Sequence, residues 1–455
     1  MIKNNIPVTL LLLFAFTFVS SELISQNWEV GEWTITFTDP DRSGRNIPCQ
    51  VYYPAANAGQ NVPLAEGKFP HVVFGHGFVM NVGAYSSIAE SLAEQGFIVL
   101  LVNTETGFSP SHTNFARDLA FVADDVLVRG GISGDFFFGK VNGKFAIGGH
   151  SMGGGCTYLS VQYLNNDAAC LFTFAAAETN PSAIEQMSSL NTPNLLLAGE
   201  LDCVAPPEDH QIPMYNAQSG DDCKFYVEIE GGYHCQFNDF NFNCNLGESF
   251  CSPSGGLDRA SQIEIVLGEL VPWLHSFLYQ DLIMEGTENI RGEDTVRTGE
   301  TYIFEVDYFD FLNYDWRVWG AEIITGEFTN RIEIFISEDS DEDIELSLTF
   351  SDGFCLEETL EKIVTLEKSV SVEDQLNKPE YSLIDYGGYF EVHFSQTINT
   401  PKIVLTDVIG RVNRLFRYES NSVFQISKEG LIPGIYFLII RNSESSDLLV
   451  KLQIY

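Results

Sequence analysis

Basic residues are scarce in this 455-residue chain. Lysine and arginine together number 24 against 63 aspartate and glutamate residues, which gives a formal net charge of −39. A surface with this excess of negative charge repels phosphate groups, so nucleic acid and anionic membranes are excluded as partners. Long hydrophobic runs are also few, and after residue 26 no stretch has the length that a membrane-spanning helix needs.

The one long apolar run lies at the amino end. Lys3 precedes the apolar residues 6–19, and Ser20 and Ser21 follow. The run is short for a membrane span and lies where a secretory signal peptide is found. We therefore expect residues 1–26 to be a signal peptide, with a buried first helix as the alternative. The mature chain is expected to have no membrane span and to be secreted or attached to the cell surface.

Nine cysteines in an exported chain indicate disulfides, although an odd number leaves at least one thiol without an internal partner. Cys156 and Cys170 lie in apolar runs and are expected to be buried thiols. The best candidates for bridges fall in one window of the sequence, and the pairing among them stays open: Cys203, Cys223, Cys235, Cys244 and Cys251.

The length indicates two or three domains. Residues 27–280 alternate between β-rich apolar runs and segments with helical periodicity, which predicts a mostly parallel sheet covered by helices on both faces. The expected strands are 51–53, 71–74, 97–102, 144–148, 169–174, 194–198 and 224–229, and the expected helices are 84–94, 115–128 and 263–278.

Beyond residue 280 the pattern changes to short alternating strands. Residues 285–368 have the strand spacing of a β-sandwich, with strands expected at 301–307, 314–318, 331–336 and 344–350. The acidic stretch 337–343 is expected to be a solvated loop, with calcium binding as the alternative. A second β-rich unit, 370–455, carries no catalytic constellation. The predicted fold class is an α/β domain followed by two small all-β domains.

The sequence GHSMG at residues 149–153 has the G-x-S-x-G pattern. It follows a short apolar strand, as in a nucleophile elbow, where a serine sits on a sharp turn between a strand and a helix. Glycines beside the serine let strand and helix approach closely enough to hold the strained turn. Ser151 is therefore the candidate nucleophile, while an ordinary glycine-rich loop is the alternative for the pattern alone.

An acid and a base follow in the order expected for such an enzyme. Asp202 comes just after the strand 194–198, and His234 comes after the strand 224–229 and two glycines. Because the carboxyl ends of parallel strands share one edge of a sheet, Ser151, Asp202 and His234 are expected to meet there, in the chain order of the α/β-hydrolase fold. Asp202 could instead cap the next segment, and Glu200 is a weaker rival acid. The rival histidines for the base are His71, His76, His150 and His210.

Two backbone amides are candidates for the oxyanion hole. The strand 71–74 runs into a glycine turn that ends at Phe78, and Met152 follows the nucleophile directly. Both amides are placed to donate to a developing oxyanion. His76 and His150 lie inside these two motifs and are expected to line the substrate pocket.

With these residues in place, the region 28–279 resembles secreted α/β-hydrolases of the chlorophyllase-like, dienelactone-hydrolase-like and cutinase or polyester-hydrolase type. The segments that carry the resemblance are FGHGF (74–78), GHSMGGG (149–155), GELD (199–202) and GYH (232–234). The resemblance implies an α/β-hydrolase fold and ester hydrolysis. Cys203 and Cys235, beside the acid and the base, are similar to the active-site disulfide of some of these enzymes, with Cys223 as a competing partner.

The two β-rich units also resemble known modules. Residues 285–368, with YDWRVWGAEII (314–324) and DGFC (352–355), resemble the PKD-like, immunoglobulin-like modules of Bacteroidetes surface proteins. Residues 370–455, with DVIGR (407–411) and LIPGIYF (431–437), resemble the C-terminal sorting domain of the type IX secretion system. This resemblance implies the type IX secretion machinery as a partner.

The sequence therefore predicts a secreted serine esterase that needs no metal and no organic cofactor. Its substrate is expected to be an ester, which could be bulky or polymeric because the segment between 177 and 194 has room for one short helix and no lid. The alternatives are a non-catalytic surface-displayed binding or adhesion protein on a hydrolase scaffold, or a lipase or peptidase of the same fold.

Overall fold

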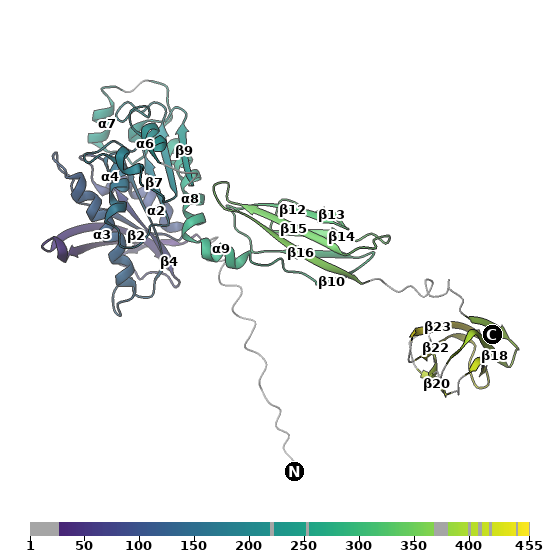
Figure 1. Ribbon diagram of the computed structural model, residues 1–455. Coiled ribbons are helices and arrows are strands. Elements are labelled where there is room, and N and C mark those ends of the chain that lie inside the picture. Colours follow the sequence, from purple (N-terminus) through teal and green to yellow (C-terminus); the bar gives the residue numbers. More distant parts are fainter. Residues whose placement is uncertain are drawn as a thin grey trace, which may run out of the picture. The chain divides into compact units, whose positions relative to one another are not determined.

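The computed structural model describes residues 27–218, 223–251, 254–367, 381–398, 402–407, 412–417, 421–442 and 445–454 (Figure 1). The predicted signal peptide, residues 1–26, lies outside the described residues. The chain divides into two compact units. The first comprises Met1–Asp294, Glu300–Ser337 and Glu342–Thr365, and the second comprises Thr295–Gly299, Glu338–Asp341 and Leu366–Tyr455.

A nine-stranded sheet organises the first part of the chain, in the order β3-β1-β2-β5-β4-β6-β7-β8-β9. The six strands from β5 to β9 in this order are mutually parallel, whereas β1 and β2 pair antiparallel with each other and β2 pairs antiparallel with β5. The strands are β1 (Glu29–Asp39), β2 (Arg45–Ala55), β3 (Gly59–Gln60), β4 (Phe69–Gly75), β5 (Ile98–Val102), β6 (Val141–His150), β7 (Cys170–Phe174), β8 (Asn194–Gly199) and β9 (Lys224–Ile229).

Helices cover both faces of this sheet. The α-helices are α2 (Ser86–Glu94), α3 (His112–Gly130), α4 (Met152–Ser160), α5 (Ala183–Met187), α6 (Gln211–Ala217), α7 (Phe242–Glu248), α8 (Arg259–Leu278) and α9 (Gln280–Gly286), and the short 3-10 turns are η1 (Pro40–Arg42), η2 (Val82–Tyr85), η3 (Val161–Tyr163) and η4 (His234–Gln236). Helices α2 and α8 pack together against one face, and α3 to α6 form the other layer (Figure 1). No helix in the described part of the chain is both long enough and apolar enough to cross a membrane.

The local sequence explains these elements. Every residue of the central strand β4 is buried, as expected for a parallel strand covered on both faces. Helix α3 begins where the Ser111 hydroxyl accepts a hydrogen bond from the Asn114 amide, and its apolar face faces the sheet. The mostly parallel α/β sheet predicted from the alternating pattern is confirmed. The pattern did not predict the long antiparallel strand β1.

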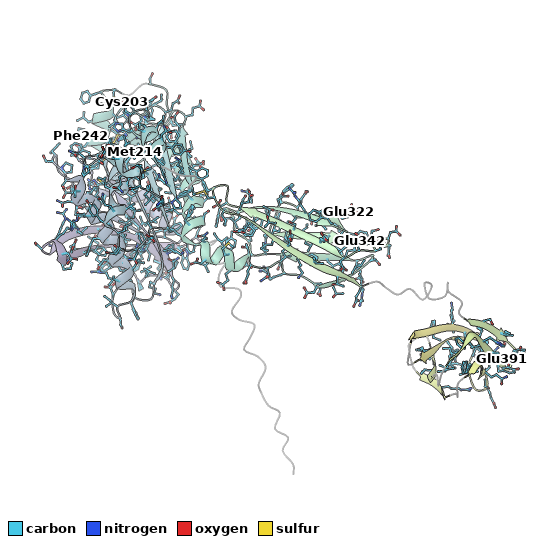
Figure 2. All side chains as sticks on the ribbon, in the orientation of Figure 1. Cys203, Met214, Phe242, Glu322, Glu342 and Glu391 are labelled. Carbon is cyan, nitrogen blue, oxygen red and sulfur yellow. A yellow bond between two sulfur atoms is a disulfide. The ribbon has the colours of Figure 1, made fainter. Side chains whose placement is uncertain are left out.

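Two smaller sheets form the β-sandwich of the first unit. One contains β16 (Glu357–Glu367), β15 (Ile344–Ser351) and β12 (Asn313–Trp319), and the other contains β11 (Thr301–Glu305), β14 (Arg331–Phe335) and β13 (Glu322–Thr325). Alternate residues of these strands are buried, and Trp316 and Phe350 lie in the core. Figure 2 labels Glu322 and Glu342 on this sandwich. The acidic stretch 337–343 is a loop between β14 and β15.

A disulfide joins the nine-stranded sheet to the sandwich. Cys223, directly before the edge strand β9, is bonded to Cys355 in the turn between β15 and β16, and we call this pair the sandwich bridge. Beside it, the Phe354 ring lies edge-on against Phe225 and Trp273, with centroids 5.3 Å away in each case. The bridge is therefore accompanied by a small aromatic contact.

The second unit contains β10 (Thr295–Arg297) and strands β17 (Tyr381–Asp385), β18 (Tyr389–Ile398), β19 (Lys402–Asp407), β20 (Val412–Arg417), β21 (Asn421–Ser427), β22 (Gly434–Asn442) and β23 (Ser445–Ile454). Strands β17 to β23 form two antiparallel sheets, β17-β18-β21 and β20-β19-β22-β23. Their inward side chains, including Phe390, Phe424 and Leu438, make a separate core. Residues 408–411 of the motif at 407–411 lie outside the described residues.

Candidate active site

The candidate nucleophile lies between the central strand β6 and helix α4. Ser151 has φ 54° and ψ −118°, a left-handed conformation that is costly for a residue with a side chain. Its amide donates to the Phe174 carbonyl, and its carbonyl accepts from the amides of Gly155 and Ala177. These bonds hold the strained turn, and a serine in this conformation at the end of a parallel strand is the geometry of a nucleophile elbow.

Two glycines make the elbow possible. A Cβ on Gly149 would lie 2.4 Å from the backbone of Gly153, and a Cβ on Gly153 would lie 2.1 Å from the Gly75 carbonyl oxygen. Both distances are far below van der Waals contact, so any larger residue would push the start of α4 away from β4 and β6. The glycines predicted from the motif therefore act by permitting close approach of backbone to backbone.

An aspartate and a histidine meet at the carboxyl edge of the sheet. Asp202 follows β8, and His234 opens the turn η4 after β9. The Nδ1 atom of His234 lies 2.7 Å from Oδ2 of Asp202, and both side chains are buried. The other carboxylate oxygen accepts the amides of Val204 and Ala205, each at 2.8 Å. Because a carboxylate only accepts, Nδ1 of His234 carries a proton, and in the neutral form of the ring Nε2 has the lone pair.

The loop that carries the histidine is held from two sides. Glu200, the rival acid, accepts the Gly231 amide at 2.7 Å, so its carboxylate supports this loop. On the other side Gln262 of α8 bonds both backbone groups of Tyr233: its Oε1 accepts the amide and its Nε2 donates to the carbonyl, each at 2.8 Å. The sequence analysis did not predict a role for Gln262. The available signal was a glutamine at helical spacing from the buried apolar residues Val266 and Leu270 of α8.

Ser151 is brought to the same edge through its neighbour. Among the described residues the Ser151 hydroxyl makes no hydrogen bond with the His234 ring, but the ring of His150 lies 4.7 Å from that of His234, centroid to centroid. Hydrogen bonds between catalytic groups are often long before substrate binds. Ser151 as a whole residue is 7% exposed. The complete triad remains a prediction.

The two amides predicted for the oxyanion hole are available as donors. Phe78 lies in the turn after β4, where the Met80 amide donates to the Gly77 carbonyl, and Met152 is the first residue of α4. Within the described parts of the chain neither the Phe78 amide nor the Met152 amide has a hydrogen-bond partner. Gly75, at the start of the first turn, touches Gly153, so the two segments are neighbours.

The histidines predicted to line the pocket are both fully buried. His76 lies with Nδ1 2.8 Å from the Gly77 carbonyl and Nε2 2.7 Å from the Thr104 carbonyl. His150 also has a partner at each nitrogen, Tyr85 and the His234 carbonyl. Burial lowers the pKa of both rings, that of His150 to well below its usual range with His234 adding to the effect. Their role in a pocket remains a prediction.

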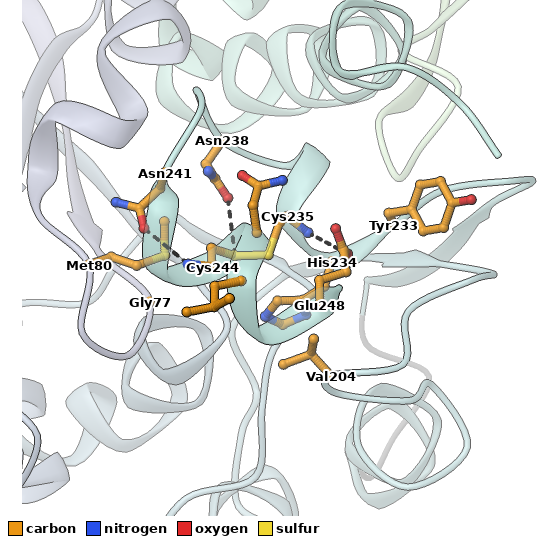
Figure 3. The surroundings of a disulfide bond; sticks show 12 residues. Gly77, Met80, Val204, Tyr233, His234, Cys235, Asn238, Asn241, Cys244 and Glu248 are labelled. Carbon is orange, nitrogen blue, oxygen red and sulfur yellow. Dashed lines mark hydrogen bonds between the residues drawn. A yellow bond between two sulfur atoms is a disulfide. The ribbon is translucent and has the colours of Figure 1, made fainter. Parts of the chain in front are cut away.

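Disulfides flank Asp202 and His234, the predicted acid and base, but in a different pairing from the one that the resemblance implied. Cys203 is bonded to Cys251, the acid-side bridge, and Cys235 is bonded to Cys244, the base-side bridge (Figure 3). The implied Cys203–Cys235 pair is therefore wrong. The reason is the segment between η4 and α8, which folds back and brings Cys244 and Cys251 within 5.7 and 5.8 Å, Cα to Cα, of their partners.

The folded-back segment is fixed beside the base. Glu248 of α7 accepts the Cys235 amide at 3.0 Å, and Asn241 caps α7 by accepting the Cys244 amide (Figure 3). Asn243 donates to the carbonyl of Val79, next to Phe78, at 2.9 Å. The segment thus connects the base to the predicted oxyanion loop. Cys223 pairs outside this region, and the remaining cysteines, Cys49, Cys156 and Cys170, are buried thiols, which confirms the expectation for the last two.

Large apolar side chains are exposed around these residues. They lie in the oxyanion turn, just after the acid, and in the folded-back segment, and Figure 2 labels one of them, Phe242. We call this set the apolar rim: Phe78, Val204, Phe240, Phe242, Leu246 and Phe250. No group of three or more His, Cys, Asp or Glu side chains in the described part of the structure is arranged to hold a metal ion.

Comparison with known proteins agrees with this geometry. Residues 34–252 match the family described as PETase: PET hydrolase-like. A bis(hydroxyethyl) terephthalate hydrolase of Streptomyces coelicolor is 25% identical over 192 residues, which are 42% of this chain and 56% of that protein. Cutinase 2 of Thermobifida cellulosilytica is 27% identical over 191 residues, 40% of this chain and 64% of that protein.

A third relative, cutinase cut1 of Thermobifida fusca, is also 27% identical over 191 residues, 40% of this chain and 52% of that protein. The chain thus spans 52–64% of the length of these curated relatives. The matched region contains β2 to β9 together with Ser151, Asp202 and His234. Residues 34–252 are therefore similar to PET hydrolase-like proteins, to cutinases and to a terephthalate hydrolase.

Proposed function

We propose that residues 27–280 form a serine esterase that cleaves carboxylic esters through an acyl-enzyme. The observation that carries this proposal is the buried contact of 2.7 Å between His234 Nδ1 and Asp202 Oδ2, beside a serine on a strained elbow. A histidine fixed in this tautomer presents Nε2 as a general base, which is what a neutral serine hydroxyl needs in order to attack an ester. The cutinases and the terephthalate hydrolase among the relatives support an ester as substrate.

In the proposed reaction the Ser151 oxygen attacks the ester carbonyl while its proton passes to His234 Nε2. Asp202 stabilises the resulting imidazolium, and the imidazolium then protonates the departing alcohol. Water attacks the acyl-serine with His234 again as base, and the acid product leaves. The amides of Phe78 and Met152 donate to the oxyanion of each tetrahedral intermediate, and each such donor lowers the barrier by about 2.7–4 kcal/mol.

The finer proposal is that the substrate is bulky or polymeric. The apolar rim exposes six large side chains on segments that adjoin the acid, the base and the oxyanion turn, and Phe250 is 82% exposed. An exposed apolar patch beside a reactive centre favours an apolar ligand that is larger than the centre itself. Between β7 and β8 lies one short helix, α5, and the other described residues there form loops, so this connection offers no long helical lid.

We also propose that the enzyme is exported and displayed. Three disulfides are compatible with an oxidising compartment. Residues 1–26 would act as a signal peptide, 285–368 as a PKD-like spacer and 370–455 as a type IX sorting domain. Removal of residues 370–455 should then leave ester hydrolysis intact and abolish surface attachment, measured by activity in cell and medium fractions. Equal attachment of the shortened protein would contradict the sorting role.

The esterase proposal is tested with Ser151→Ala and p-nitrophenyl butyrate. We expect the variant to lose more than about 10³-fold in kcat and to lose labelling by a fluorophosphonate probe. The matched control is Ser160→Ala, which removes a buried hydroxyl from the same helix, α4, where it bonds the Thr157 carbonyl. Retained turnover in Ser151→Ala, or a wild type that neither turns over nor reacts with the probe, would refute the esterase and favour a binding protein.

Substrate size is tested with a panel of p-nitrophenyl butyrate, bis(2-hydroxyethyl) terephthalate, a long-chain ester, an amide and a polyester film. The variant Phe250→Ser should release fewer soluble products from the film and leave hydrolysis of the butyrate unchanged. The control is Phe328→Ser, a phenylalanine of the sandwich that is also largely exposed, at 72%. Equal losses of film hydrolysis in both variants would show that the apolar rim does not bind the film. Preferred cleavage of the amide would indicate a peptidase, and preferred cleavage of the long-chain ester would indicate a lipase.

A further inference from the structure

A buried tyrosine and a buried histidine connect three parts of the active site. Tyr85, the last residue of η2, lies with its hydroxyl oxygen 2.9 Å from the Gly77 amide nitrogen and 2.8 Å from Nδ1 of His150. Nε2 of His150 lies 3.1 Å from the carbonyl oxygen of His234. Both side chains are at most 1% exposed. The chain of contacts runs from the oxyanion turn, through the residue before the nucleophile, to the backbone of the base.

Donor and acceptor chemistry fixes the direction of every bond in this chain. A carbonyl oxygen only accepts, so His150 must carry its proton on Nε2 and donate to His234. A neutral ring then has an unprotonated Nδ1, which accepts the Tyr85 hydroxyl proton. The Tyr85 oxygen in turn accepts the Gly77 amide. Every polar atom in the chain is therefore satisfied, as buried polar groups must be, and no second arrangement of protons satisfies all three bonds with a neutral ring.

The surroundings agree with a neutral ring at position 150. Burial first, and then the electrostatic effect of the neighbouring His234, lower the pKa of His150 well below its usual range. The other hydrogen-bonding atom near the Tyr85 hydroxyl is the Met80 sulfur at 3.2 Å, a weaker acceptor than an imidazole nitrogen. The proton of Tyr85 is accordingly directed to His150, and protonation of His150 would reverse this bond, because Nδ1 would then donate to the Tyr85 oxygen.

We propose that Tyr85 and His150 act together as a positioning pair that sets the distance between the oxyanion turn and the general base, with the nucleophile between them. This inference rests on the proposed esterase function. His150 is bonded to the residue that carries the nucleophile, so its ring fixes Ser151 by the main chain and His234 by the hydrogen bond. The next amide after the anchored Gly77 is that of Phe78, the proposed oxyanion donor. The pair holds the backbone on both sides of the nucleophile, while Asp202 orients only the ring of the base.

This role differs from the pocket role predicted for His150 from the sequence. A pocket residue contacts the substrate, so its loss raises KM and does so more for a bulky ester than for a small one. A positioning residue does not contact substrate, and its loss lowers kcat to the same extent for every ester. Misplacement of reacting groups by about 1 Å costs about 100-fold in rate.

The test compares Tyr85→Phe and His150→Leu with a control, Tyr158→Phe. Tyr158 is as deeply buried, and its hydroxyl bonds Thr173 away from the base and the oxyanion turn. For both p-nitrophenyl acetate and bis(2-hydroxyethyl) terephthalate we expect kcat to fall about 10- to 100-fold in the first two variants, with KM changed less than about twofold. His150→Gln keeps a donor toward the His234 carbonyl and should restore part of the rate.

Two results would overturn the positioning role. Either Tyr85→Phe behaves like Tyr158→Phe in both kinetic constants, or His150→Leu raises KM selectively for the terephthalate ester and leaves kcat unchanged, as a pocket residue would. Partial unfolding of a variant would also lower the apparent kcat and leave KM unchanged. Thermal unfolding of all four variants therefore shows which losses of rate come from unfolding alone.

A second readout does not depend on activity. Nitrogen-15 spectra of the histidine side chains, with the His150 signal identified by its absence in His150→Gln, report the tautomer directly. We expect the wild type to hold the Nε2–H form down to acid pH. An Nδ1–H form or a protonated ring at neutral pH would refute the proposed hydrogen bonds of the Tyr85–His150 pair, even if none of the variants folded. If the wild type hydrolyses no ester, the proposed function fails, while this spectrum still decides the hydrogen-bond chain.

Discussion

The three disulfides should separate stability from catalysis, because they close very different lengths of chain at different distances from the site. The sandwich bridge spans 132 residues, the acid-side bridge 48 and the base-side bridge 9. A bridge stabilises mainly by removing loop entropy from the unfolded chain, so its effect grows with the length of the loop that it closes. We therefore predict opposite rankings of the three bridges for stability and for activity.

Loop closure gives the expected magnitudes. With an entropy loss of about 2.1 + 1.5R ln n cal/mol/K, removal of a bridge should lower the free energy of unfolding by about 5 kcal/mol for the sandwich bridge, about 4 for the acid-side bridge and about 2.6 for the base-side bridge. The base-side loop lies wholly within the loop of the sandwich bridge and shortens it by only a few residues, so the ranking stands.

Activity should follow the reverse order. The base-side bridge begins at Cys235, directly after His234, and the acid-side bridge begins at Cys203, directly after Asp202. Release of either neighbour loosens a residue that must keep its position to within about 0.5 Å. Cys223 instead precedes the edge strand β9, whose full length lies between it and the loop of the base. Its removal should change kcat by less than about twofold.

The assay uses paired Cys→Ser variants, so that no new free thiol remains. Urea unfolding gives the stability of each variant, and kcat for p-nitrophenyl butyrate at a temperature where all are folded gives activity. The loss of kcat should be at least about tenfold without the base-side bridge. Equal activity in all three variants would refute the active-site role of the two flanking bridges, and a sandwich-bridge variant as stable as the wild type would refute the loop-entropy argument.

Three further outcomes follow from the buried polar groups. Burial lowers the pKa of His71 and of His275 to about 4, so the unfolded chain binds more protons than the folded chain between pH 4 and 6.5. The free energy of unfolding should therefore fall by up to about 3 kcal/mol per histidine as pH drops through this window. Urea midpoints measure this fall, and His275→Asn is the comparison that should depend less on pH. Asp202→Asn should lower kcat by about 10⁴-fold, whereas Glu200→Gln, which keeps an acceptor for its backbone partner, should cost less than about tenfold; equal losses would reassign the acid. Gln262→Leu removes two hydrogen bonds from the loop of the base and should cost about 2–4 kcal/mol in unfolding free energy together with a lower kcat, and an unchanged kcat would show that α8 does not position the base.

The parts of the site that follow strand ends could be predicted from the sequence. Parallel strands place their carboxyl ends at one edge of the sheet. The positions of Asp202 and His234 after two such strands were therefore enough to predict that they meet, and their side chains lie 2.7 Å apart. The G-x-S-x-G pattern was enough to predict the left-handed serine. An ordinary helix start does not require glycine on both sides of a serine, whereas the close approach of strand and helix at an elbow does.

Contacts that depend on the path of a loop could not be predicted in this way. The pairing of Cys235 with Cys244 and not with Cys203 is decided by how residues 235–251 fold back, and no periodicity describes that path. Tyr85 gave no signal either, since it lies at the end of an apolar turn where a tyrosine is ordinarily a core residue. Its hydroxyl becomes informative only when the partner at position 150, distant in sequence, is known to face it.

His234, the proposed base, is the residue on which these separate supports converge. Its ring is held by Asp202, its carbonyl by His150, the residue before it by Gln262 of α8, and the residue after it by the amide contact with Glu248 and by the base-side bridge. The turn η4 that carries it is only three residues long and has no strand pairing to fix it. A short turn can keep an imidazole in place only if contacts from outside the turn supply the rigidity, and here buried hydrogen bonds from several elements supply it, none of them made to Nε2.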